Sequence, residues 1–172
     1  METQTPRQRM LSAYRGLPSD TIPVAPEFWY YIPARVLGIP MLELELEVPH
    51  WKALQATFNH YNCEGWGIVS PSTPIGWGFP ESSAIHKLSE GQFEKVTIIS
   101  GTQILSARTR YDPLEPSWQT ERYIKDFHLD WPVYESQTLV PPNSLNWKPV
   151  QEALDTVVED FLLEVFIGFP FI

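Results

Sequence analysis

Two stretches of the chain repeat apolar residues at the spacing of an amphipathic helix. The first begins after Asn146, a residue type that favours a helix start. Its apolar positions are Val150, Leu154, Val157, Val158 and Phe161. The second runs up to Gly65, with its apolar positions at Trp51, Leu54, Phe58 and Tyr61. The pattern therefore predicts a helix in each stretch.

Capping residues predict three further helices. Thr5 followed by Pro6 is a favourable helix start, and this helix ends at Gly16. Residues 33–37 read as a short helix closed by Gly38. Ser117 caps a third helix, which stops before Pro132. Its apolar residues are Tyr123, Ile124 and Phe127.

Continuous apolar runs predict the strands. Ile22–Trp29 reads as a buried first strand, although Pro23 and Pro26 weaken it. Residues 66–69 form the second strand, 70–83 a loop, and 163–172 a last strand that leads into a loop. Residues 41–47 alternate apolar and acidic side chains, which leaves helix and strand both open.

A β-hairpin is the clearest local signal. Residues 96–100 and 103–107 are rich in β-branched side chains and flank Gly101 and Thr102. A two-residue loop with glycine first suits a type II′ turn. Antiparallel hairpins are not part of a parallel barrel wall, so we expect this one to be an insertion.

Composition and charge limit the classes of molecule that we expect this chain to bind. The chain has 172 residues, of which 43% are hydrophobic and 19% charged, as in a folded domain. Its net charge is −9 and no Lys or Arg cluster is present, which disfavours nucleic acid and anionic membranes as partners. Cys63 is the one cysteine, and no signal peptide is recognisable. We expect a cytoplasmic protein with a small-molecule substrate.

Several segments resemble the start of the uroporphyrinogen decarboxylase superfamily. They are residues 7–16, 18–24, 26–31, 63–67 and 118–126, with the hairpin between the last two. The resemblance implies an α/β fold, the N-terminal portion of an eight-stranded (β/α)8 barrel that carries the hairpin as an insertion. A complete barrel takes about 250 residues. We therefore expect residues 1–172 to be one domain, cut off before the barrel closes.

One difference from the decarboxylase sequence pattern indicates which branch of the superfamily this chain resembles. Decarboxylases carry an Arg-Gln-Ala-Gly-Arg run after the first strand to clamp substrate carboxylates, whereas this chain has Glu27 there and no arginine until Arg35. The resemblance therefore favours a corrinoid-linked methyltransferase over a porphyrinogen decarboxylase. It implies zinc, bound by a His-x-Cys pair and a later Cys beyond residue 172, and a corrinoid on a partner protein. From the resemblance we therefore expect the metal ligands beyond residue 172.

The residues at the end of the predicted first strand are the candidate substrate site. They are Glu27, Trp29, Tyr30 and Tyr31. Tyrosine hydroxyls orient polar substrates while aromatic rings exclude water. The alternative is that the rings only plug the barrel end and Glu27 pairs with Arg35. No catalytic residue is identified, and the pair His60 and Cys63 provides too few ligands for a metal.

Two other functions stay open. Aromatic, acidic barrels also bind sugars, but a glycoside hydrolase needs a second carboxylate that no sequence feature identifies. A natural short chain would instead be a non-catalytic binding module. A half barrel would expose strand edges and apolar surface, which favours a homo-oligomer.

Overall fold

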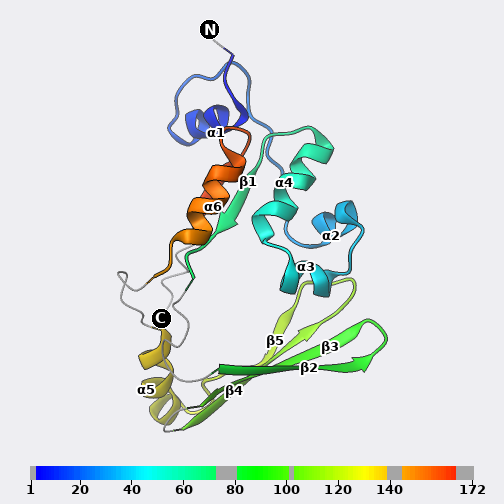
Figure 1. Ribbon diagram of the computed structural model, residues 1–172, viewed down its shortest axis with the longest axis vertical. Helices are drawn as coiled ribbons and strands as arrows, with labels where there is room; N and C mark the ends of the chain where they lie inside the picture. Colours follow the sequence, from blue (N-terminus) through cyan, green and yellow to red (C-terminus); the bar gives the residue numbers. More distant parts are fainter. Residues whose placement is uncertain (1–2, 73–80, 101–102, 139–144, 166–172) are drawn as a thin grey trace. The chain divides into compact units, whose positions relative to one another are not determined.

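The computed structural model describes residues 3–72, 81–100, 103–138 and 145–165. These residues form two compact units, shown in Figure 1. The first combines the segments Met1–Pro71 and Trp147–Ile172, and the second is the segment Ser72–Asn146 between them. Each unit is described by itself below.

The first unit is built on two parallel strands. β1 (Trp66–Val69) pairs with β6 (Leu162–Val165), with Trp66 opposite Leu162 and Val69 opposite Val165. The helix α6 (Lys148–Val157) lies between them in the chain and returns it to the same end of the sheet. The second predicted strand is thus confirmed. The last predicted strand is confirmed as far as Val165, because residues 166–172 lie outside the described part.

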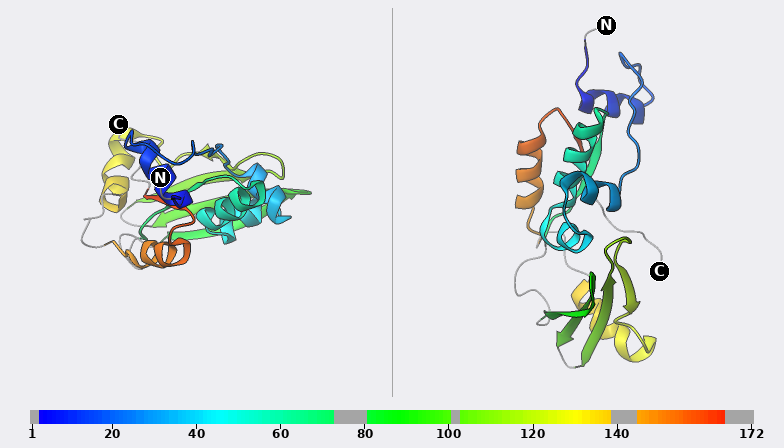
Figure 2. Two further views of the ribbon diagram at one scale, coloured as in Figure 1. Left: turned by 90° about the horizontal axis from the view of Figure 1, so that it is seen from above. Right: turned by 90° about the vertical axis from the view of Figure 1, so that its right-hand side faces the viewer.

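The core of this unit lies between β1 and two helices. α6 and α4 (His50–Tyr61) lie beside β1 in Figure 1 and in the right-hand view of Figure 2. The fully buried core residues are Leu54, Phe58, Ala153, Val157 and Phe161. The apolar spacing of both segments therefore predicts the correct buried faces, except that Tyr61, Leu154 and Val158 are exposed.

Glycine in β1 permits this close packing. A Cβ atom on Gly67 would lie 2.5 Å from Cε1 of Phe161 and 2.9 Å from Cβ of Trp51. A Cβ atom on Gly65 would lie 2.3 Å from Cδ2 of Phe58. The two glycines therefore allow aromatic side chains to lie directly on the strand.

Three short helices precede this core. α1 (Pro6–Tyr14) starts at the predicted cap, Thr5, and the structure adds a capping box in which Thr5 and Gln8 bond to each other's backbone N–H. α2 (Tyr31–Leu37) ends at Gly38, whose φ of 69° is left-handed. Residues 41–47, ambiguous in sequence, form the helix α3 (Met41–Glu47), which buries Met41 and Leu44.

The predicted first strand, Ile22–Trp29, is wrong. These residues are irregular, and Ile22 and Val24 are 88% and 60% exposed. Pro23 and Pro26 have no N–H to donate to a strand ladder. The N–H of Val24 instead donates to the Glu64 carboxylate, 2.9 Å away.

The second unit is a four-stranded antiparallel sheet with the order β2-β3-β4-β5. The strands are β2 (Glu81–Ser89), β3 (Gln92–Ser100), β4 (Ile104–Tyr111) and β5 (Trp118–Glu121). The predicted hairpin is confirmed as the β3–β4 pair, inserted between β1 and α6. The loop predicted at 70–83 is wrong at its end, since residues 81–83 belong to β2, and residues 73–80 lie outside the described part.

The β3–β4 register differs from the expected one. Ser100 pairs with Ile104 and Ile99 with Leu105, so three residues separate the last pair instead of two. Gly101 and Thr102 lie outside the described residues, and their turn type is not assigned. A shift of one residue in the register turns the side chains of one strand to the opposite face of the sheet relative to the other strand.

The predicted helix after Ser117 is also wrong. Trp118–Glu121 forms the strand β5, paired with β4. The helix α5 (Phe127–Thr138) starts later and contains Pro132 within it. Asp126 caps it by accepting from the N–H groups of His128 and Leu129. In the strand, Glu121 lies opposite Arg108 and accepts a hydrogen bond from its Nε. Helical spacing along the sequence does not reveal this partner.

The start of α6 differs from its prediction as well. Asn146 does not cap the helix, because its backbone exchanges two hydrogen bonds with Ser72. Trp147 precedes the first helical residue without a side-chain cap. The fold is mixed α/β, with one parallel and one antiparallel sheet, and no barrel closes within the described residues.

Candidate functional site

Glu27 and Trp29 contact each other where the irregular segment meets α2. The Trp29 Nε1–H donates a hydrogen bond of 2.7 Å to Oε1 of Glu27. Both side chains are exposed, and Trp29 keeps 45% of its surface accessible. The indole also meets the Trp66 ring edge-on, with centroids 6.0 Å apart. The carboxylate is therefore held beside a large, accessible aromatic ring.

His50, the first residue of α4, joins this pair to Tyr30. Its ring is nearly parallel to Trp29, with centroids 6.1 Å apart, and lies 4.9 Å from the Tyr30 ring. Its Nε2 is 3.1 Å from the Trp29 carbonyl oxygen. A carbonyl only accepts hydrogen bonds, so Nε2 carries the proton and Nδ1 holds a lone pair.

Burial keeps this imidazole uncharged. It lowers the pKa of His50, and the bond to the Trp29 carbonyl and the charge of Glu45 oppose that effect only in part. Burial also raises the pKa of Tyr30, with a smaller contribution from Glu45. Both groups are therefore neutral near pH 7, and the Tyr30 phenol keeps its proton to donate.

Tyr31 faces a cation of its own helix. The Arg35 guanidinium carbon lies 5.7 Å from the centre of the Tyr31 ring, and Nη1 is 3.4 Å from the Tyr31 hydroxyl. The alternative in which Arg35 pairs with Glu27 is not what the structure shows. Glu27 bonds to Trp29 instead, and Arg35 covers Tyr31.

A cleft of about 360 Å³ opens at the carboxyl end of β1. Its wall combines Ile68, Val69 and Ser70 of that strand end with the start of α4 and residues along the length of α6. Pro49 lies just before α4, which supplies His50, Trp51 and Lys52, and α6 supplies Pro149, Glu152, Ala153 and Thr156. His50 borders the cleft and also contacts Trp29 and Tyr30, whereas Glu27, Trp29 and Tyr30 do not line the cleft.

The structure therefore brings Glu27, Trp29 and Tyr30 together through His50 and turns Tyr31 toward Arg35. Sequence reasoning missed His50, because an isolated histidine carries no motif. The available signal was its place directly after Pro49, at the start of a helix that leads into β1.

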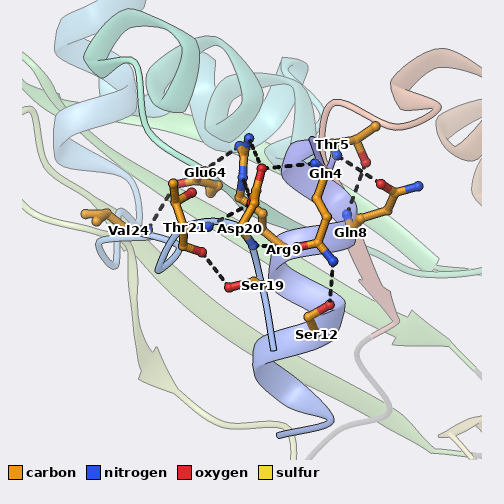
Figure 3. A network of polar contacts seen from close by, with 10 residues as sticks. All are labelled: Gln4, Thr5, Gln8, Arg9, Ser12, Ser19, Asp20, Thr21, Val24 and Glu64. Atoms are coloured by element: carbon orange, nitrogen blue, oxygen red, sulfur yellow. Dashed lines mark hydrogen bonds and ion pairs between the residues drawn. The ribbon is translucent and has the colours of Figure 1, made fainter. Parts of the chain in front are cut away.

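A charged network fixes the segment that carries this cluster (Figure 3). Arg9 of α1 bonds to Asp20 through Nε at 2.8 Å and Nη2 at 3.3 Å, and its Nη1 is 3.1 Å from Glu64. The hydrogen bond from Arg9, with further bonds from backbone N–H groups, lowers the pKa of Asp20 to about 2. Burial acts to raise the pKa of Glu64, but bonds from Val24 and Arg9 outweigh it and lower that pKa.

Cys63 lies beside this network and not in the cluster. Together with Arg9, Asn59, Asn62 and Glu64 it borders a polar cavity of about 520 Å³. Burial raises the pKa of its thiol, which keeps it protonated and unreactive. The neighbouring His60 meets Tyr61 edge-on. Within the described residues, no group of three or more His, Cys, Asp and Glu could hold a metal ion.

Comparison of the chain with family models, with curated proteins and with solved structures returns no match. Across the described part of the chain, no helix combines the length and apolar character needed to cross a membrane.

Proposed function

We propose that the first unit supplies one wall of a substrate pocket in an enzyme of the uroporphyrinogen decarboxylase type. Within that superfamily, we propose corrinoid-linked methyl transfer and not porphyrinogen decarboxylation. The observation that carries the proposal is the cleft at the carboxyl end of β1, bordered by His50, which also contacts the aromatic cluster that carries Glu27.

The arrangement of strands supports this placement. β1 and β6 are parallel and joined by α6, which is the repeating element of α/β barrels. Enzymes of that architecture bind substrates at the carboxyl ends of their strands. Under the proposal, the pair is a portion of a barrel wall, and the cleft lies at its substrate-binding end.

The charge of the site supports methyl transfer. A porphyrinogen carries several carboxylates, which need guanidinium groups to receive them. Glu27 is negative, and Arg35 lies over the Tyr31 ring. A multiply carboxylated substrate would therefore meet repulsion where it needs a cationic clamp.

The zinc that the family uses finds no fitting donor set in the described residues, so no step is assigned to it. A corrinoid, when bound on a partner protein, would give or accept the methyl group. The residues of this chain would bind and orient the other substrate: Tyr30 by donating a hydrogen bond, Trp29 by excluding water.

The test compares two reactions of the same protein. The protein translated from the whole reading frame, with the zinc ligands that are expected beyond residue 172, is incubated with methylcobalamin, zinc and 2-mercaptoethanol. It is expected to form the S-methyl thioether in proportion to protein, followed by mass spectrometry. Incubation with uroporphyrinogen is expected to leave all its carboxylates in place. Carbon dioxide release from uroporphyrinogen, or no protein-dependent thioether, would overturn the proposal.

A pair of variants places the reaction at this site. Glu27→Gln keeps the hydrogen bond to Trp29 but removes the charge, and we expect it to slow methyl transfer. Glu43→Gln removes an exposed charge on α3 and should leave the rate unchanged. Equal rates in both variants would place the reaction elsewhere.

A further inference from the structure

Electron-rich groups gather on the accessible side of the aromatic cluster. Oε1 of Glu27 accepts from Trp29, and Oε2 accepts no hydrogen bond from any described residue. The Trp29 ring is 45% exposed. A carboxylate and an aromatic face both attract positive charge.

The cations of this region are already placed on aromatic rings. Arg35 lies 5.7 Å from the Tyr31 centroid, and Nζ of Lys52 lies 5.4 Å from the Trp51 centroid. No Lys or Arg of the described residues forms an ion pair with Glu27. Within the described residues, no Lys or Arg thus pairs with the Glu27 carboxylate or lies over the Trp29 ring.

We propose that Glu27 and Trp29 bind an organic ammonium ion. The inference rests on the proposed function and deepens it, because it assigns the substrate class as a methylated amine. The ammonium lies against the Trp29 face and the Glu27 carboxylate balances its charge, while His50 and Tyr30 pack in turn beside the indole.

The groups of the site favour a methylated ammonium over a hard metal ion and over a neutral ligand of the same shape. A hard metal ion takes several oxygen ligands, and Glu27 offers one carboxylate. A neutral ligand of the same shape keeps the apolar contact with Trp29 but loses the attraction to the carboxylate and to the ring. A methylated ammonium carries both an apolar surface and a diffuse positive charge, so it satisfies every group of the site.

The experiment uses choline as the probe and 3,3-dimethylbutan-1-ol, its neutral isostere, as the reference. Calorimetric titration of the full chain is done without corrinoid or zinc. We expect saturable binding of choline and at least roughly tenfold weaker binding of the isostere. Equal affinities, or no binding of choline, would overturn the inference.

Variants then locate the probe. Glu27→Gln should weaken choline binding by roughly fivefold, and Trp29→Leu by at least as much. Trp147→Leu and Glu43→Gln change an exposed ring and an exposed charge elsewhere in the unit and should bind choline as the unaltered chain does. Because Trp29 packs on His50 and Trp66, circular dichroism confirms that its variant is folded. Unchanged affinity in folded Glu27→Gln would also overturn the inference.

The two proposals fail separately. Methyl transfer to 2-mercaptoethanol without choline binding keeps the proposed function and removes the amine as its substrate. Choline binding without methyl transfer keeps the ammonium site and removes the reaction.

Discussion

Arg9 shows how one side chain positions the segment that leads to the aromatic cluster. Its guanidinium reaches Asp20 and Glu64, and Glu64 in turn accepts from the N–H of Val24. The three ionic side chains are each less than one fifth exposed, so water competes weakly for their hydrogen bonds. The irregular chain before Glu27 is therefore held by named contacts even though no strand forms there.

Replacing Asp20 with Asn should change how stability depends on pH. The folded-state pKa of Asp20 is about 2, below its ordinary value of 3.8. This carboxylate therefore contributes stability above about pH 4 and loses that contribution as the pH falls toward 2. Urea unfolding should show a stability difference between the chain and D20N at pH 7 that shrinks between pH 4 and 2. A constant difference would contradict this assignment.

Replacing Gly67 with Ala should destabilise the first unit. The added Cβ would lie within 3 Å of Phe161 and Trp51, two large side chains in a packed core. Overpacking of this kind costs about 1–3 kcal/mol. Urea denaturation of G67A measures it, and E43A, at an exposed position of α3, is the matched control. The prediction fails if both variants unfold at the same midpoint.

Among the elements, sequence patterning succeeded where one face is buried. α4 and α6 place most of their periodic apolar residues against the core, although Tyr61 and Leu154 are exposed, and β1 is a short apolar run that is buried at alternate residues. The pattern failed where partners are distant in sequence. Ile22–Trp29 is apolar but cannot donate a full ladder, and Trp118–Glu121 pairs with β4 through contacts that helical spacing cannot anticipate.

Pro132 lowers the stability of α5, and a substitution can test this effect. It lies inside the helix, where its nitrogen cannot donate to the carbonyl of His128. Pro132→Ala should restore that hydrogen bond and stabilise the helix by about 1–3 kcal/mol. A higher urea midpoint and a stronger helical circular dichroism signal would confirm it. Ser136→Ala, at an exposed position of α5, controls for the helix propensity of alanine. An equal gain from both variants would contradict the role of the proline.

At the scale of the molecule, the second unit is an insertion into the first. Residues 72–146 separate β1 from α6, and their ends meet where Ser72 and Asn146 exchange backbone hydrogen bonds of 3.0 and 2.8 Å. An inserted unit whose ends are adjacent interrupts the host chain little. The helix α6 can therefore return the chain to β6 as if the insertion were a short loop.

Excision of the insertion tests this organisation. Joining Ser72 to Asn146 by Asn-Gly, a sequence that favours a two-residue turn, should leave the first unit able to fold. We expect cooperative unfolding and a helical circular dichroism spectrum from the shortened chain. Loss of the cooperative transition would show that the first unit needs the insertion.

The grouping of residues at the candidate site was anticipated in part. The segment Glu27–Tyr31 was found because its aromatic and acidic residues follow an apolar run, although that run is not a strand. The cleft and His50 could not be predicted, since they depend on the first turn of α4 meeting the carboxyl end of β1. The link from Trp29 to His50 spans 21 residues and leaves no periodic signal.

The most direct test of the site follows the indole N–H signals of the seven Trp residues by two-dimensional 1H–15N NMR while choline is added. Trp29→Phe assigns the signal of Trp29, whose N–H donates to Glu27. If choline binds at Glu27 and Trp29, this signal shifts first and saturates, while the signal of Trp147 stays in place. Shifts that spare Trp29, or that move all indoles alike, would contradict a ligand site built on Glu27 and Trp29.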